Sequence, residues 1–373
     1  MTDSTLKRHF TGDCARELAE RILPVLPSFD AEGFVREVDE AVGPLELKDR
    51  VRVLAEGIRS RLPESYPEAV DVLVRSLGPE LPDAEGTMSS AWFLMPVARF
   101  VEIYGLQHPE TSLAALDAIT RRHTAEYAIR PYLAGHQELT LQQVHRWTQS
   151  ESFHVRRLAS EGIRPRLSWA SHHRPFKADP EPVLAVLTEL IDDPSLYVRR
   201  SVANGLNDIS KDNPARALSA AKQWLEQSPT DRTRWVVRHG LRSLIKAGDA
   251  GALALVDATP DRSVVVEALT VSPEVLRIGE TLTIAAEVRN VSDERREAVV
   301  DYTVHFLGAD GSLRPKVFKL KRVMLEPGAR VTLTKRRSFR PVNARTLYPG
   351  PHAASVQANG QRTEQVTFVL EEA

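Results

Sequence analysis

The residues best suited to chemistry lie in one stretch, 150–170, whose spacing predicts a helix. Residues that recur every three or four positions share one face of a helix. One face collects a single carboxylate and its basic neighbours, namely His154, Arg157, Glu161 and Arg164. An acid among cations suits a surface that binds an anion and supplies one chemical acid or base. The same pattern is equally typical of a solvated helix face, so both interpretations stand.

Carboxylates are the remaining catalytic candidates, because the sequence holds no phosphate-cradling glycine loop, zinc-ligand spacing or serine-nucleophile elbow. Besides Glu161, they are Glu126 and Asp208. Acids that face an arginine-lined groove can stabilise a cationic sugar or base and orient a water. The alternative for each acid is an ion pair with a neighbouring arginine. His172 and His173 are adjacent and cannot ligate one metal from a shared helix face, so we expect no metal site.

The composition is that of an ordinary soluble protein with enough chain for two domains: 373 residues, 42% hydrophobic, 27% charged and a net charge of −1. The basic residues are unevenly spread, since residues 121–177 contain ten of them against four acidic ones. A single cysteine, Cys14, excludes an internal disulfide and a cysteine-rich metal site. The sequence shows neither a signal peptide nor a membrane span, so we expect a cytoplasmic protein.

Repetition gives the elements that must position these residues. Segments 154–163, 197–206 and 235–244 align without gaps at offsets of 43 and 38 residues, near the spacing of HEAT-type helical repeats. One apolar position of the alignment is occupied by Val155, Val198 and Val236, and another by Ile163, Leu206 and Leu244. A HEAT-like solenoid of stacked helices is therefore predicted.

The shared polar position of these repeats holds an arginine in each, with a weaker fourth match upstream: Arg157, Arg200, Arg238 and Arg130. A solenoid turns the same face of successive helices toward one surface, so the arginines should form a row. Such a row can hold phosphates along a strand. The alternative is a row of salt bridges between repeats.

An insertion, residues 164–176, lies between the first two repeats, breaks the regular period with two prolines and contains Trp169. Inserted loops often serve the binding face of a solenoid. Upstream, apolar spacing and prolines predict helices at 14–26, 34–42, 47–62, 69–77, 92–104 and 112–133. The last would carry Arg122, Glu126 and Arg130 on one face and would end or kink at Pro131.

The period changes near residues 257–261, and beyond Val264 apolar residues alternate, as in β-strands. Short strands between glycine-containing turns predict a disulfide-free, immunoglobulin-like sandwich of about seven strands. The predicted domains are thus 1–260, helical, and 264–373, a β-sandwich. Residues 314–340 are strongly basic and predict either a second polyanion contact or the protection of strand edges, with equal weight.

Segments 125–133, 150–170 and 192–214 resemble the AlkC branch of the AlkC/AlkD-type DNA alkylation-repair glycosylases. The resemblance covers roughly residues 85–250, and an Ig-like domain follows in one branch of that family. It implies hydrolysis of the N-glycosidic bond of cationic N-alkylated bases, such as 3-methyladenine and 3-methylcytosine, in double-stranded DNA. It further implies a monomer of the bacterial cytosol or nucleoid that needs no cofactor.

The resemblance places the family's catalytic carboxylates on Glu126, Glu161 and Asp208 and its active-site tryptophan on Trp169; core packing is the alternative for the tryptophan. Contacts to DNA are expected from seven residues: Arg130, His154, Arg157, Arg164, Arg166, Arg200 and Arg238. The competing hypotheses are a non-catalytic helical-repeat protein that binds DNA and a protein-binding scaffold. The acids discriminate between them, because carboxylates that face DNA weaken binding and need a chemical reason.

Overall fold

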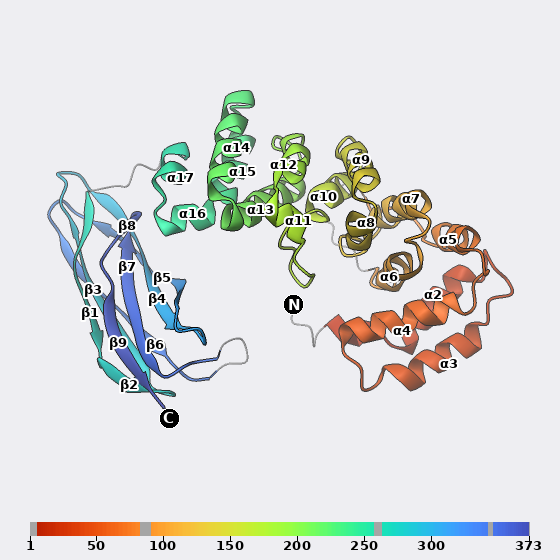
Figure 1. Ribbon diagram of the computed structural model, residues 1–373, viewed down its shortest axis with the longest axis horizontal. Helices are drawn as coiled ribbons and strands as arrows, with labels where there is room; N and C mark the ends of the chain where they lie inside the picture. The colour runs from red at the N-terminus through yellow and green to blue at the C-terminus, as the bar shows by residue number, and fades with distance from the viewer. Residues whose placement is uncertain (1–5, 83–90, 257–262, 342–345, 373) are drawn as a thin grey trace. The chain divides into compact units, whose positions relative to one another are not determined.

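The computed structural model describes residues 6–82, 91–256, 263–341 and 346–372. It divides into two compact units, Met1–Leu241 and Arg242–Ala373. Helices precede strands along the chain, as the sequence predicts (Figure 1). Two short helices, α16 (Arg242–Ala247) and α17 (Ala250–Leu255), group with the strands. The predicted domain boundary between 260 and 264 falls mostly on residues outside the described ranges and stays a prediction.

The first unit begins with the proline-punctuated helices that the apolar spacing predicts. They are η1 (Lys7–His9), α2 (Gly12–Ile22), α3 (Ala31–Val42), α4 (Leu47–Arg59) and α5 (Tyr66–Arg75). Side-chain caps fix two of the starts: Thr11 accepts a hydrogen bond from the backbone of Asp13, and Asp30 accepts one from Gly33. None of the helices in the described ranges is long and apolar enough to cross a membrane.

The helix predicted over 112–133 is two helices. The elements here are α6 (Leu94–Tyr104), α7 (Pro109–Thr120), α8 (Arg130–Gly135) and α9 (Gln137–Thr148). Pro131 lies in the first turn of α8, where a missing N–H costs nothing, so it starts a helix and does not end one. Glu126 consequently lies on the connection between α7 and α8 and shares no helix face with Arg122 and Arg130.

The three aligned segments form stacked helices: α10 (Phe153–Glu161) packs against α13 (Leu196–Asp212), and α13 packs against α15 (Asp231–Gly240). Their shared valines are fully buried. The predicted helix over 150–170 is shorter, because it ends at Glu161. The third repeat also ends early, and Leu244 lies on α16. Three further helices accompany the stack: α11 (Arg174–Ala178), α12 (Glu181–Thr188) and α14 (Pro214–Gln227).

The second unit contains two sheets. One has the order β1-β3-β6, and the other β2-β9-β7-β4-β5, with β8 paired to β7. The strands are β1 (Val264–Ser272), β2 (Val275–Arg277), β3 (Thr281–Asn290), β4 (Arg296–Leu307), β5 (Leu313–Leu325), β6 (Arg330–Ser338), β7 (Gly350–Ala358), β8 (Gln361–Arg362) and β9 (Val366–Glu371). Alternate residues of β3 are buried, which confirms the predicted period of two. β2 and β8 are short, which explains why the sequence predicts fewer strands.

The basic stretch of the sandwich occupies two strands at sheet edges. β5 ends one sheet and β6 ends the other. The ring of Phe318 on β5 is covered by the guanidinium of Arg337 at 4.2 Å and approached by the amine of Lys316 at 5.6 Å. Cations at these positions discourage pairing with another strand, in line with edge protection. The alternative contact with a polyanion stays a prediction.

Candidate active site

The three predicted carboxylates belong to one continuous network of ion pairs. Arg157 links the first two: its Nη1 lies 3.2 Å from Glu126 Oε2, and its Nη2 lies 3.5 Å from Glu161 Oε1. Arg164 links the last two, with Nη1 2.6 Å from Glu161 Oε1 and Nε 2.8 Å from Asp208 Oδ2. The structure therefore brings together all three acids that the sequence singles out.

Each acid comes from a different segment of the helical stack. Glu126 precedes α8, Glu161 ends α10, and Asp208 lies within α13. Gly162 lets the segment before α8 pack closely on the end of α10, because a Cβ at this position would lie only 2.7 Å from the side-chain Cγ2 of Ile129. The packing of α10 on α13 then sets the distance between Glu161 and Asp208.

The acids are buried rather than solvated. The exposed fractions of the side chains are 10% for Glu126, 8% for Glu161 and 2% for Asp208. A buried carboxylate is costly unless it is paired and hydrogen-bonded. The interpretation of this charged pattern as a solvated helix face is therefore wrong.

Hydrogen bonds from hydroxyl groups complete the network, and the sequence patterns gave no signal for them. Ser201 donates from Oγ to Glu161 Oε2 over 2.8 Å, and Ser160 donates to Ser201 over 2.7 Å. Thr124 donates to Glu126 and accepts from Arg157 Nη1 at 2.7 Å. These contacts orient the carboxylate oxygens of Glu126 and Glu161, so the charges of these two acids have fixed places.

The electrostatic balance keeps Glu161 ionised. Burial alone would raise the pKa of Glu161, but Arg157 and Arg164 with the Ser201 hydroxyl hold it below its usual value. Conversely, burial opposes the charge of Arg157, and the two glutamates raise its pKa. Asp208 has a second cation nearby, with Lys211 Nζ 3.3 Å from its Oδ1.

Aromatic rings adjoin the network. The guanidinium of Arg157 lies 5.1 Å above the ring of Tyr197. The pKa of Tyr127 is raised to about 12, first by burial and then by the charge of Glu126. Tyr127 follows Glu126 directly in the sequence and was missed, because a tyrosine beside an acid has no distinctive spacing.

Trp169 lies on the loop that begins directly after Glu161. Its side chain is 58% exposed, so core packing, the alternative interpretation, is wrong. Its backbone φ is +65°, the left-handed region that non-glycine residues seldom adopt. The loop thus presents a large apolar ring on the surface, at a backbone position that needs outside support.

The seven predicted DNA-binding residues have different environments in the structure. Arg157 and Arg164 pair with the acids described above. Arg166 forms two hydrogen bonds with Asp212, at 2.7 and 2.6 Å, and Arg130 donates to backbone carbonyls. His154 is buried, with its ring 4.1 Å from that of Phe153. Arg200 and Arg238 are exposed. Contacts to DNA remain predictions for all seven.

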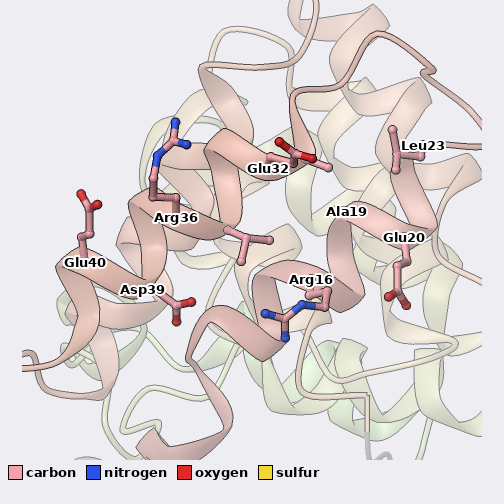
Figure 2. Close-up of a pocket in the computed structure, with 10 residues that line it drawn as sticks. Arg16, Ala19, Glu20, Leu23, Glu32, Arg36, Asp39 and Glu40 are labelled. Carbon is pink, nitrogen blue, oxygen red and sulfur yellow. The ribbon is translucent and has the colours of Figure 1, made fainter.

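A groove of about 720 Å³ lies elsewhere, between α2 and α3 (Figure 2). Its lining mixes small apolar residues with charged side chains that include Arg16, Glu20, Arg36 and Asp39. None of the predicted site residues lines it, and one of its acids, Asp39, already accepts a hydrogen bond from the backbone of Gly12. The chemistry is therefore expected at the carboxylate network.

The chain is similar to known proteins over almost its full length. A family model described as DNA alkylation repair enzyme matches residues 113–244, and one for the C-terminal Ig-like domain of the uncharacterised protein YhaZ matches residues 265–372. The protein is 35% identical to the solved structure of the alkylpurine DNA glycosylase AlkC of Pseudomonas fluorescens, bound to DNA containing an abasic site analog. That match covers 98% of this chain and 99% of that one with a TM-score of 0.79. The chain belongs to the DNA alkylation repair enzyme family.

This DNA alkylation repair family member has a second full-length relative, the uncharacterized protein YhaZ of Bacillus subtilis (strain 168). The two are 35% identical over 364 residues, which cover 97% of this chain and 98% of that relative. The resemblance based on three short segments is thus confirmed. The alkylation-repair match includes the three carboxylates and Trp169, and the Ig-like match covers the strands of the sandwich.

Proposed function

We propose that this protein is a DNA glycosylase that hydrolyses the N-glycosidic bond of cationic N-alkylated bases, of the 3-methyladenine and 3-methylcytosine class, in double-stranded DNA. One observation carries the proposal: three buried carboxylates from three separate segments of the chain converge in one network. A protein that only bound phosphates would gain from the arginines and lose affinity from the acids. The full-length similarity to AlkC, described as a glycosylase, supports the same conclusion.

The chemistry of the substrate explains why acids are needed. An alkylated base that is already positively charged leaves readily, so the enzyme gains little by protonating it. The sugar then develops oxocarbenium character, and fixed negative charge nearby stabilises that cation. Glu161 and Asp208 provide this charge and can orient the attacking water, with Glu126 as the third acid. Because the leaving group carries its own charge, the reaction needs neither a metal nor an organic cofactor.

Trp169 contributes a surface for the nucleotide. An exposed indole ring can pack against the deoxyribose or the base through dispersion and cation–π attraction. A positively charged base strengthens the cation–π attraction. Trp169 and the acids together would recognise the two parts of the cationic transition state.

The second candidate is a non-catalytic protein that binds DNA. It is favoured by a specific observation, the pairing of each carboxylate with an arginine in the structure. In that case the network would only stabilise the helical stack, and the exposed arginines would hold DNA. A protein-binding scaffold would likewise use the network for stability.

The deciding experiment measures methylated bases released from alkylated duplex DNA by the purified protein, using chromatography. Wild-type protein is expected to release them, and Glu161→Gln or Asp208→Asn to lose roughly 10²–10³-fold in rate with little change in DNA affinity. Glu181→Gln is the matched control, because Glu181 pairs with Arg216 at an exposed position outside the network. If the wild-type protein released no base, the proposed enzymatic activity would be rejected. If the variants released bases as fast as wild type, the assignment of these acids to the active site would be rejected.

A further inference from the structure

The loop that carries Trp169 is fixed at its base. It runs from the end of α10 at Glu161 to the start of α11 at Arg174. The backbone of His173 donates to the carbonyl of Pro165 over 3.0 Å. Arg166 adds its two hydrogen bonds to Asp212 on α13. These contacts close the base of the loop, and the backbone of Ala170 donates to the carbonyl of Leu167 over 3.3 Å at its tip, but the two arms around the strained Trp169 need further support.

Arg130 supplies that support from α8. Its Nη1 donates to the carbonyls of Gly162 and Arg164, at 3.2 and 2.8 Å, and its Nη2 donates to the carbonyl of Ser171 at 2.8 Å. The three carbonyls lie on both sides of Trp169. A guanidinium is a planar fork with fixed donor directions, so one side chain sets the separation of the two arms of the loop.

The setting of Arg130 argues against the phosphate contact predicted from the repeat alignment. Arg130 is half-buried, and that burial lowers its pKa to about 10. A cation is kept in such a place only if hydrogen bonds compensate for the lost water. Three backbone carbonyls provide them here, and each would lose its donor if Arg130 swung out to a phosphate.

Lys48 adds an anchor from the N-terminal helices. Its Nζ donates to the carbonyl of Trp169 over 2.9 Å, although the two residues are 121 positions apart. The bond is made to the residue with the strained backbone. None of the catalytic or DNA-binding residues predicted from the sequence lies in these helices, and this contact links α4 directly to the loop.

We propose that Arg130, assisted by Lys48, is a positioning residue that holds Trp169 in the orientation needed for base release. The inference rests on the proposed glycosylase function for the role of Trp169, but the fixing of the loop does not. A displacement of about 1 Å in a group that contacts the reacting nucleotide can cost about 10²-fold in rate. The effect of Arg130 must then pass entirely through Trp169.

A double-mutant cycle tests this dependence. Arg130→Lys keeps the charge but loses the fork, and is expected to slow single-turnover base release at least tenfold, with DNA affinity within about threefold. In a Trp169→Ala background the same substitution should slow release by less than twofold. An equal loss in both backgrounds would overturn the inference. If Arg130→Lys folds poorly, Lys48→Met provides a second test, because Lys48 is exposed. It should slow release about threefold in the wild-type background and leave the rate unchanged in the Trp169→Ala background.

The matched control is Arg122→Lys. Arg122 also donates to backbone carbonyls, those of Gly78 and Ala118, but away from the loop. Its substitution should leave release unchanged; a slowing equal to that of Arg130→Lys would show a general structural effect and overturn the inference.

Hydrogen exchange gives a readout that does not depend on activity. Amides of residues 162–173 should exchange faster in Arg130→Lys than in wild type, while those of α13 keep their rates. Unchanged loop exchange would overturn the inference. If the loop exchanges faster in Arg130→Lys but the wild-type protein releases no base, only the proposed function is rejected. If the wild-type protein is active but Arg130→Lys slows release equally with and without Trp169, only this inference is rejected.

Discussion

Arg157 and Glu126 are separated by 31 positions in the chain, yet Nη1 of the arginine lies 3.2 Å from Oε2 of the glutamate. The contact joins the connection before α8 to α10. It also holds Glu126 in place, which lies on a connection and is not positioned by a helix. Because Arg157 also pairs with Glu161, its single positive charge partly neutralises two buried carboxylates. Removing Arg157 therefore leaves both carboxylates with less compensating charge.

Arg157→Met should destabilise the protein by about 3–5 kcal/mol, because breaking a buried pair leaves uncompensated charge. The free energy of unfolding, from urea denaturation followed by circular dichroism, measures this loss. Arg200→Met is the control: Arg200 holds the equivalent repeat position but is exposed, so its loss should stay within about 0.5 kcal/mol. Adding Glu126→Gln to Arg157→Met should recover part of the stability. A loss below about 1 kcal/mol for Arg157→Met would contradict the buried network.

Stability should depend on pH through Glu161. Its pKa in the folded protein lies below the ordinary 4.5 of the unfolded chain, so its contribution is complete above that value and disappears as the pH falls through the folded pKa. The difference in unfolding free energy between wild type and Glu161→Gln should be constant above about pH 5.5 and shrink below 4.5. A difference that stayed constant down to pH 3 would show that the pKa of Glu161 is not lowered in the folded protein, and would contradict this prediction.

DNA binding should weaken steeply with salt, since contacts to phosphates release counterions. Arg200→Ala should lower the slope of log affinity against log salt by about one, if its exposed side chain holds one phosphate. Fluorescence anisotropy with a duplex at several salt concentrations measures the slope. Arg216→Ala, which removes an exposed cation paired with Glu181, should leave it unchanged. Equal slopes for wild type and Arg200→Ala would remove Arg200 from the DNA contacts.

The cations of β5 should protect a sheet edge. Replacing Lys316, Lys319 and Lys321 together with glutamine is expected to promote self-association, because β5 ends its sheet and the three side chains are exposed. Sedimentation velocity detects association, and DNA affinity is measured on the same sample. The control replaces Arg16, Arg75 and Lys222 with glutamine, which makes the same change in charge at exposed positions on helices. A monomeric triple variant with weaker DNA binding would favour the polyanion contact instead.

The sequence by itself determined the two-part architecture and the candidate acids. Hydrophobic period is a local property: spacing near 3.6 before the change near residues 257–261 and near 2 beyond Val264 was enough to separate helices from strands. Repetition likewise identified α10, α13 and α15 as stacked elements, because equivalent residues of a solenoid meet equivalent neighbours.

Only the tertiary structure decided what the charged residues contact. The helix predicted over 112–133 was wrong because Pro131 suits a helix start as well as an end, and local spacing cannot distinguish the two. Arg130 and Arg157 occupy matched positions in the repeat pattern, yet one donates to the carbonyls around Trp169 and the other forms ion pairs with Glu126 and Glu161. Those partners come from segments tens of positions away, and burial, which makes each pairing obligatory, exists only once the helices have packed.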